Sequence, residues 1–330
     1  MWQVVGYDIA VALLDSGLKG GKLSHAYLFV GPPHVGKMTL ASNLAQALNC
    51  QGDDQPCGVC ASCQRIAQLR HADVQVIGPN GRAEISIDQI REMERSASLK
   101  PFEGRNRVFI IDGAEQLSSE GANSLLKTLE EPPPNVQIIL LAVNEGLLLP
   151  TVRSRCQRLE LRPLPITVVE RALIEQWEAT PEQAMVLARL SLGCLGWAVG
   201  ALSDDSVTGK RAERLSALLQ LTCVGRAERF AYAGQLASQF SKDREALREV
   251  LSLWVGLWRD LLLVKVGCRD LITNIDQEES LCRETENYNL NRIKGFIESL
   301  QHALEELGQN ANPRLVLEVL MLNLPQSEGS

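Results

Sequence analysis

A loop rich in glycine and proline near the N-terminus has the residues to bind phosphate. Residues 31–38 read Gly-Pro-Pro-His-Val-Gly-Lys-Met, which matches the pattern G-x-x-x-x-G-K-[ST] except at its last position. The glycines of such a loop let backbone N–H groups surround phosphates at the positive end of a helix, and Lys37 would reach the β- and γ-phosphates. The sequence therefore predicts a nucleotide site of the kind that holds ATP.

The last position of this pattern bears on the metal ion. Ser or Thr would place a hydroxyl on Mg²⁺, but the chain has Met38, whose thioether is a poor ligand for a hard cation. Thr39 does not simply replace it, because the next residue along a helix points about 100° away. Phosphate binding is expected, with ATP and Mg²⁺ binding uncertain and hydrolysis in doubt.

Four cysteines follow with metal-ligand spacing. Cys50, Cys57, Cys60 and Cys63 form the pattern C-x6-C-x2-C-x2-C. Four thiolates complete the tetrahedral coordination of Zn²⁺ and leave no open position, which is typical of a structural site. An iron–sulfur cluster and four cysteines without metal remain alternatives. We predict structural zinc. The odd total of nine cysteines, without an export signal, also favours reduced thiols over disulfides.

Composition limits the class of protein. The chain has 330 residues, 45% hydrophobic content and a net charge of −7, with a pI near 5.3. This length allows two or three domains, and the acidic balance disfavours free-standing binding to nucleic acid. Residues 1–17 lack the basic region of a signal peptide, and no uncharged apolar run is long enough to span a membrane. We expect a cytoplasmic protein.

The first half of the chain alternates short apolar runs with helical patterns, which is typical of a parallel α/β sheet. The predicted strands are 26–30, 74–77, 108–112 and 137–143, and the predicted helices include 87–99 and one between Ser118 and Pro132. The strand 108–112 ends in Asp112, as a strand does whose carboxylate approaches the metal of a nucleotide site. After about residue 165 the pattern is helical to the end, with Asn312 and Pro313 beginning the last helix. Residues 203–206 read as a hinge between helical parts.

Several segments together resemble one family, the bacterial DNA polymerase III clamp-loader subunits of the AAA+ class. They are Ser24-His25-Ala26, the four-cysteine module, Ala122–Pro133, Thr151–Cys156, Asp270–Asp276 and Asn310–Glu318. The resemblance covers nearly the whole chain. It implies an α/β plus all-α protein: an AAA+ module over residues 1–164 with a zinc-binding insertion at 50–63, a helical lid over 165–205, and a helical collar for oligomerisation over 206–330.

The resemblance also implies partners. Such subunits form a hetero-pentamer of tau/gamma and delta-type chains, which opens the sliding clamp and places it on primed DNA. The chain would then be a subunit of the DNA polymerase III holoenzyme. No membrane partner is expected, and the resemblance implies association with the nucleoid or replisome.

Departures from the family pattern favour the delta-prime type over the ATP-hydrolysing tau/gamma motor. Gly113 follows Asp112 where a working ATPase has a water-orienting Glu, and Glu115 stands at the wrong offset for that role. Gly196 stands where the motor carries an arginine that senses the γ-phosphate. With Met38, three catalytic parts differ. We expect a structural and regulatory subunit without independent catalysis; an unusual motor and a separate zinc-containing DNA-binding protein are the alternatives.

The resemblance assigns site residues. The nucleotide set, which could be vestigial, comprises Gly31, Gly36, Lys37, Thr39, Asp112 and Asn144. Arg155, in Ser154-Arg155-Cys156, would enter the ATP site of the neighbouring subunit as an arginine finger. The alternative is a local ion pair with a carboxylate such as Glu160.

Contact with DNA is the last expectation. Helix N-termini that line the ring would approach the DNA backbone, and the candidates are the helices that start near Ser86, with Arg91, and near Ser118. The alternative is a solvated helix face on which Arg91 and Arg95 balance Glu92 and Glu94.

Overall fold

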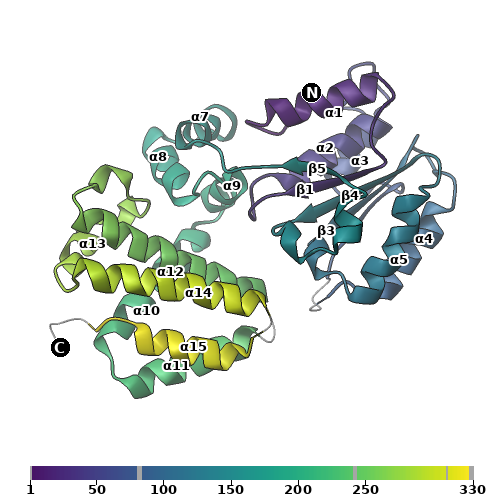
Figure 1. Cartoon of the computed structure of the whole chain (residues 1–330). Coiled ribbons are helices and arrows are strands. Elements are labelled where there is room, and N and C mark those ends of the chain that lie inside the picture. Colours follow the sequence, from purple (N-terminus) through teal and green to yellow (C-terminus); the bar gives the residue numbers. More distant parts are fainter. Residues whose placement is uncertain (1, 80–83, 241–243, 310, 327–330) are drawn as a thin grey trace. The chain divides into compact units, whose positions relative to one another are not determined.

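The computed structural model describes residues 2–79, 84–240, 244–309 and 311–326, with the side chains of residues 205, 240, 244 and 245 left aside. Contacts divide the chain into two compact units, shown in Figure 1. The N-terminal unit comprises Met1–Ala172 and Gly193–Trp197, and the C-terminal unit comprises Leu173–Leu192 and Ala198–Ser330. Each unit is described by itself. Asn310 of the sequence motif lies outside the described residues.

A five-stranded parallel sheet forms the centre of the N-terminal unit, in the order β2-β3-β4-β1-β5. The strands are β1 Ala26–Val30, β2 Val74–Ile77, β3 Arg107–Asp112, β4 Val136–Ala142 and β5 Gln157–Glu160. The four predicted strands are confirmed, with shifts of one residue at the start of β3 and at both ends of β4. The sequence did not predict β5, because this edge strand is mostly exposed and polar.

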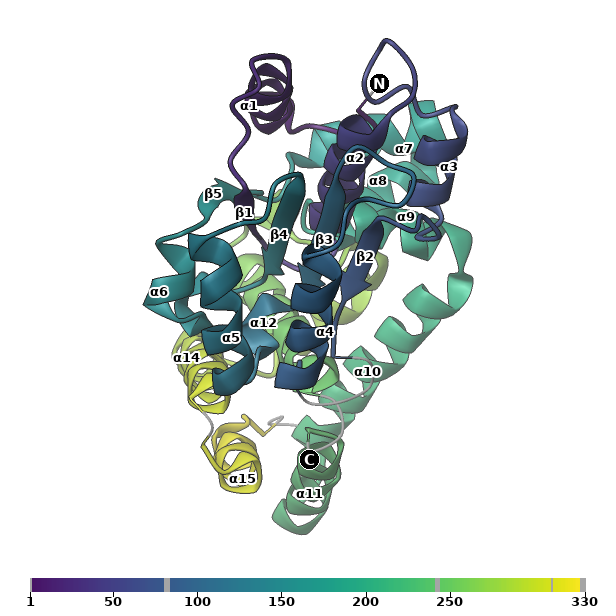
Figure 2. The ribbon, with the colours of Figure 1, turned by 90° about the vertical axis from the view of Figure 1, so that its right-hand side faces the viewer.

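Alternate residues of the strands face the two sides of the sheet. Leu28 of β1 belongs to the same buried cluster as Ile90 of α4 (Ile87–Ala97) and Leu125 of α5 (Ser119–Glu130). Phe29, the next residue, is buried with Leu44 of α2 (Lys37–Asn49). A period of two therefore makes three layers, with α4 and α5 on one face (Figure 2).

Three further helices complete the N-terminal unit. They are α1 Asp8–Lys19, α3 Ala61–Ala67 and α6 Pro150–Arg153, with short 3₁₀ turns at Ala114–Gln116 and Glu145–Leu147. Helix α4 ends two residues before the predicted end at residue 99. Residues 166–177 (α7) and 195–203 (α9) each pass from one unit to the other.

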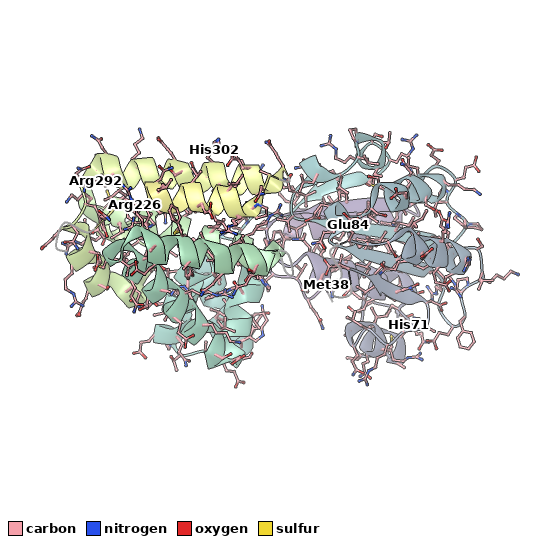
Figure 3. All side chains as sticks on the ribbon, turned by 90° about the horizontal axis from the view of Figure 1, so that it is seen from below. Met38, His71, Glu84, Arg226, Arg292 and His302 are labelled. Atoms are coloured by element: carbon pink, nitrogen blue, oxygen red, sulfur yellow. The ribbon has the colours of Figure 1, made fainter. Side chains whose placement is uncertain are left out.

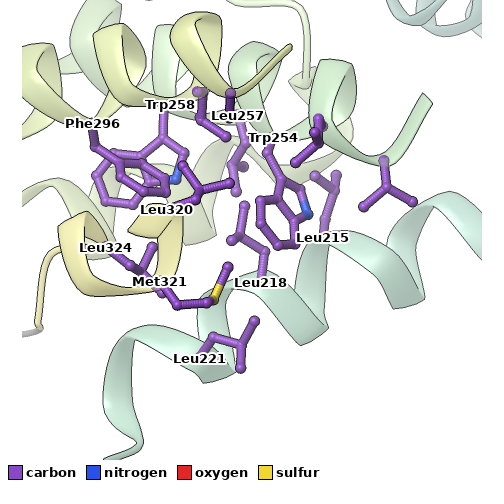
Figure 4. Packing of buried hydrophobic residues seen from close by; sticks show 14 of the residues in the cluster. Leu215, Leu218, Leu221, Trp254, Leu257, Trp258, Phe296, Leu320, Met321 and Leu324 are labelled. Carbon is purple, nitrogen blue, oxygen red and sulfur yellow. The ribbon is translucent and has the colours of Figure 1, made fainter. Parts of the chain in front are cut away.

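The C-terminal unit consists of helices around one aromatic and aliphatic core. Its other helices are α8 Pro181–Leu190, α10 Asp205–Cys223, α11 Arg226–Phe240, α12 Arg244–Lys265, α13 Glu278–Thr285, α14 Leu290–Gly308 and α15 Pro313–Asn323. The rings of Trp258 and Phe296 meet edge to face with centroids 4.8 Å apart, and Trp254 lies in the same core (Figure 4). None of the helices in the described ranges is long and apolar enough to cross a membrane.

Candidate functional site

Strand register brings the predicted nucleotide residues to one edge of the sheet. Val30, which precedes the phosphate loop, pairs with Ala142 at the end of β4, and Asp112 pairs with Leu141. The carboxyl ends of these three strands therefore lie together, which is where ligands bind in parallel α/β sheets. Asn144 follows β4 by two residues at the same edge.

The phosphate loop joins β1 to α2. Gly36 is the N-cap of α2 with φ of 108°, a conformation that L side chains rarely adopt. Lys37 begins the helix, and its Nζ donates to the carbonyl oxygens of Gly31 at 2.6 Å and Pro32 at 2.8 Å. Thr39 is exposed in the first turn of α2.

An apolar side chain, packed against the core, stands at the position where a metal-binding hydroxyl would be expected. Met38, labelled in Figure 3, packs against the buried cluster beneath the loop, as Tyr7 and Cys194 also do. The Tyr7 hydroxyl lies 2.7 Å from the carbonyl oxygen of Arg162 and 3.1 Å from that of Val35. Burial raises the pKa of Tyr7, so the hydroxyl stays protonated and donates to the backbone beside the loop. The residue at position 38 therefore contributes packing and no oxygen ligand.

Gly196 lies directly against the phosphate loop. Its backbone N–H donates to the carbonyl oxygen of His34 at 2.9 Å. A Cβ atom built on Gly196 would stand 2.7 Å from that oxygen, which is closer than real side chains approach backbone. In this arrangement an arginine at position 196 does not fit unless the loop moves.

The end of β3 carries Asp112 without a neighbouring catalytic Glu. Burial raises the pKa of Asp112, while the positive charge of Lys37 opposes that rise. Gly113 follows with φ of 76°, so a side chain there would be strained. Glu115 is engaged elsewhere, because its Oε1 accepts from the N–H of Val143 at 3.0 Å. The side chain of Asn144 caps the next turn by accepting from the N–H of Gly146 at 2.8 Å.

The four predicted metal ligands come together. The Sγ atoms of Cys50, Cys57, Cys60 and Cys63 all lie within 4.8 Å of one another, and those of Cys57 and Cys63 are 4.0 Å apart. Thiolates around tetrahedral zinc stand about 3.8 Å apart, given Zn–S bonds of about 2.3 Å. The cluster could therefore hold a metal ion such as zinc.

Backbone N–H groups point at these sulfur atoms. Those of Cys57, Cys60 and Cys63 each donate to a cluster sulfur at 3.3–3.4 Å. Burial by itself would raise the pKa of Cys60, but N–H donors, among them those of Gln51 and Cys63, and neighbouring thiols lower it to about 6. Burial raises the pKa of Cys63 to about 12. The donors thus favour thiolate at part of the cluster, as a metal requires.

Polar contacts fix the cysteine module to its unit. Gln46 of α2 donates to the carbonyl oxygen of Cys63 at 2.9 Å. On α3, Arg65 pairs with Glu103 at 2.8 Å. The loop that carries Glu103 is held in turn by Asp73, whose carboxylate accepts from the N–H groups of residues 102, 103 and 104 at 2.7–2.9 Å.

Arg155 follows α6 and lies at the surface of the N-terminal unit. Its Nη2 is 2.5 Å from Oε1 of Glu130, the last residue of α5, and its Nη1 donates to the carbonyl oxygen of Thr151 at 2.9 Å. The side chain is 34% exposed. Its carboxylate partner is Glu130 and not Glu160, which pairs with Arg158 and Arg162 instead. The sequence could not distinguish the two carboxylates, because only folding brings the end of α5 to α6.

The two predicted DNA-facing helix starts lie beside each other. Ser86 precedes α4 and Ser118 precedes α5, and the N–H of Ser118 donates to the carbonyl oxygen of Ile85 at 3.0 Å. Arg91 is exposed on α4. The expected charge balance holds in part: Arg95 pairs with Glu92 at 3.3 Å. Glu94 instead accepts from Ser124 of α5 at 3.1 Å.

Two family models match this chain. The model described as "DNA polymerase III, delta subunit" matches residues 6–165, and "DNA polymerase III, delta subunit, C terminal" matches residues 210–326. Together they account for most of its length. The chain belongs to the DNA polymerase III delta-subunit family that these models describe. Its similarity to a delta' subunit, given next, supports a delta-prime-type clamp-loader function. The parallel sheet confirms the predicted α/β part of the fold.

Three similar proteins are named as subunits of DNA polymerase III. Subunit delta' of Bacillus subtilis is 29% identical over 95% of this chain and 94% of its own length. Subunit gamma/tau of Mycobacterium tuberculosis is 29% identical over 98% of this chain but 60% of its own length. Subunit tau of Escherichia coli is 36% identical over 62% of this chain and 32% of its own length. The chain thus spans nearly all of the delta' relative but much less of the gamma/tau and tau relatives.

The sequence did not predict that Tyr7, Cys194 and Gly196 come close to the phosphate loop. Tyr7 lies 28 residues before Val35, and Cys194 and Gly196 lie about 160 residues after the loop. No spacing rule links such distant positions. The glycine at position 196 was noticed only through the family pattern, and its contact with His34 needed the fold.

Proposed function

We propose that this delta-prime-type subunit does not hydrolyse ATP itself and acts on the ATP site of a neighbouring subunit. The observation that carries this proposal is the contact between Gly196 and His34. The backbone of Gly196 is hydrogen-bonded to the phosphate loop, and this close approach leaves no room for an arginine side chain at position 196. Met38 and Gly113 remove two further contributions, the metal ligand and the water-orienting carboxylate.

Arg155 is the residue that would act in trans. Its guanidinium is at the surface, and the pair with Glu130 is solvated, so releasing it costs little. A planar guanidinium can contact two phosphate oxygens of a neighbour's nucleotide and neutralise charge that develops during hydrolysis. The neighbour would be a tau/gamma motor subunit, within a ring that also contains delta and that loads the sliding clamp on primed DNA.

The three-part division of the chain belongs to the same proposal. Residues 1–164 would be the AAA+ module, residues 165–205 the lid, and residues 206–330 the collar that joins neighbouring subunits. Cys50, Cys57, Cys60 and Cys63 would hold one structural Zn²⁺ that fixes the insertion, and the thiolate-favouring N–H donors support this assignment. Any nucleotide bound at Lys37 would not be turned over.

The test separates this subunit's site from the motor's. ATP hydrolysis is measured on the isolated chain, on the reconstituted complex, and on complexes with Lys37→Ala in this chain or the equivalent change in the motor subunit. We expect negligible turnover by the isolated chain and full turnover of the complex that carries Lys37→Ala here. Hydrolysis that survives the change in the motor but disappears with Lys37→Ala would instead favour the motor function for this chain.

DNA contact would come from the paired helix starts at Ser86 and Ser118, with Arg91 on the exposed side of α4. Reversing the charge with Arg91→Glu should slow clamp loading by the whole complex more steeply as salt rises. The matched change Arg95→Glu, on a residue already paired with Glu92, serves as the control. Equal effects of both changes at every salt concentration would favour a merely solvated helix face.

A further inference from the structure

A pocket in the C-terminal unit is lined by three arginines and lies within that unit alone. Its volume is about 700 Å³, and Arg226, Arg229 and Arg292 contribute to its wall. Arg226 comes from α11 and Arg292 from α14, and Figure 3 labels both at the same end of the helical unit. We propose that this pocket binds an acidic peptide segment of a partner protein, in which carboxylates flank a hydrophobic side chain.

Charge supports an anionic ligand. Among the described residues, none of the side chains that line the pocket is acidic, although the whole chain carries a net charge of −7. Arg226 is the first residue of a 15-residue helix, and Arg292 stands in the first turn of a 19-residue helix. The positive ends of both helix dipoles add to the charge of the two guanidinium groups. Positive potential is therefore concentrated here, on a protein that is acidic as a whole.

Arg229 keeps the wall of the pocket fixed. Its side chain is buried, with 3% of the residue exposed. The guanidinium donates to the carbonyl oxygens of Leu221 at 2.9 Å, Thr222 at 3.0 Å and Leu324 at 2.7 Å. These acceptors belong to the C-terminal turns of α10 and α15, so Arg229 ties two helices together. A rigid wall lowers the cost of ordering when a ligand binds.

An exposed leucine on the rim of the pocket distinguishes between kinds of anion. Phe296, Met321 and Leu324 line the pocket but are each at most 3% exposed, whereas Leu322 on the rim is 55% exposed and offers accessible apolar surface beside the arginines. Free phosphate has nothing to cover such a surface, and a nucleic-acid backbone presents only phosphate and sugar. An acidic peptide offers both parts, since its carboxylates match the planar fork of arginine and an apolar side chain can pack against Leu322.

The test uses the full chain and a defined probe. A fluorescein-labelled peptide with two aspartates on each side of a phenylalanine is titrated by fluorescence anisotropy, beside the same peptide with asparagines. We expect the acidic peptide to bind at least about tenfold more tightly, and the difference to shrink as salt rises. The double change Arg226→Glu and Arg292→Glu should abolish this preference. Both residues are exposed, so the fold should be retained.

A matched variant and two competing ligands show which results would contradict the proposed peptide site. Arg283→Glu makes the same kind of charge reversal on α13, outside the pocket, and should leave peptide binding unchanged. Absence of acidic-peptide binding at about 1 mM, or equal loss in the Arg283 variant, would overturn the proposal. Inorganic phosphate or a single-stranded oligonucleotide that binds the arginines as tightly as the peptide would also overturn it, because the apolar surface of Leu322 would then play no part.

Discussion

One helix, α2, carries a nucleotide-type site at its start and a metal-type site at its end. Lys37 is its first residue, and Cys50 is its C-cap. At the start, the backbone has the conformation of a phosphate loop, but Met38 and Gly196 replace the groups that a metal and a γ-phosphate need. At the end, four thiols lie within 4.8 Å of one another, with N–H donors directed at the sulfur atoms.

This difference shows that backbone geometry and side-chain chemistry are separable. Glycines at positions 31 and 36 suffice to shape the loop, whatever residue stands at position 38. Hydrolysis also needs particular side-chain atoms. The thioether of Met38, in place of a hydroxyl, removes an oxygen ligand for Mg²⁺ that the next residue does not simply supply. The start of α2 is therefore a phosphate loop in shape, whereas its end retains a complete set of ligands.

If the start of α2 is idle, this chain can contribute to catalysis only through residues that reach the ATP site of a neighbouring subunit. Arg155→Ala should lower the ATPase rate of the adjoining motor subunit by about 10³-fold or more where chemistry is limiting, because a guanidinium in trans stabilises charge on the transferred phosphoryl group. The measurement is ATPase activity of the reconstituted complex stimulated by DNA and clamp. Assembly should be unchanged.

Arg158→Ala is the matched control for Arg155→Ala. Arg158 is also exposed and ion-paired, with Glu145 at 2.7 Å, but it lies on β5. A full ATPase rate in the Arg155 variant, or an equal loss in the Arg158 variant, would contradict the role of Arg155.

Loss of a cysteine ligand near the end of α2 should strongly lower the stability of the N-terminal unit. Cys60→Ser should remove the bound metal and destabilise the N-terminal unit by about 3 kcal/mol or more, because metal binding to a closed ligand set contributes directly to folding. Metal content by mass spectrometry and thermal unfolding measure the two effects. Cys223→Ser, at an exposed cysteine outside the cluster, should change neither. Iron with visible absorption, or no metal in protein prepared without chelator, would refute the zinc assignment.

The sequence predicted the elements that depend on local patterns and missed those that depend on distant contacts. Strands β1 and β2 were placed to the residue, because their apolar runs end at glycine or polar residues. Strand β5 was not predicted, since an exposed edge strand has no apolar run. The spacing of the cysteines predicted their cluster, because four ligands within 14 residues need little of the fold.

Long-range contacts left no such pattern. Arg155 was predicted as a functional residue, but its partner Glu130 lies on another helix. The arginine pocket combines residues from α11, α14 and α15, and no segment of the sequence shows such a convergence. A short motif can therefore be recognised from the sequence, but the residues that surround it in space are known only from the structure.

The contribution of Asp73 to stability should depend on pH, because its carboxylate holds the loop of Glu103, which pairs with Arg65 of the cysteine module. Hydrogen bonds from the N–H groups of residues 102–104, together with Arg107, outweigh burial and hold the pKa of Asp73 below its ordinary value of 3.8. The native state thus favours the ionised carboxylate, so its contribution to stability is complete above about pH 5 and is lost as the pH falls below 4. Asp73→Asn should cost about 2 kcal/mol at pH 7, since charge-assisted hydrogen bonds to the backbone are weakened.

Denaturant unfolding at pH 7 and at pH 3 measures this dependence. The difference between the wild-type chain and Asp73→Asn should shrink at the lower pH, where the wild-type carboxylate is also being protonated. Asp270→Asn provides a comparison at an exposed carboxylate of the other unit. A difference that is the same at both pH values would show that Asp73 contributes through shape rather than through its charge.

The smallest expected effect concerns the start of α2 itself. Met38→Thr restores the hydroxyl of the phosphate-loop pattern, yet we expect no detectable ATP hydrolysis by the isolated chain. Gly113, with φ of 76°, still offers no carboxylate, and Gly196 still occupies the place of the sensor arginine. Stability should fall by about 1 kcal/mol, because Met38 packs against the buried cluster under the loop. Turnover by Met38→Thr that disappears in the double variant with Lys37→Ala would break the comparison, since the start of α2 would then lack only one atom of a working site.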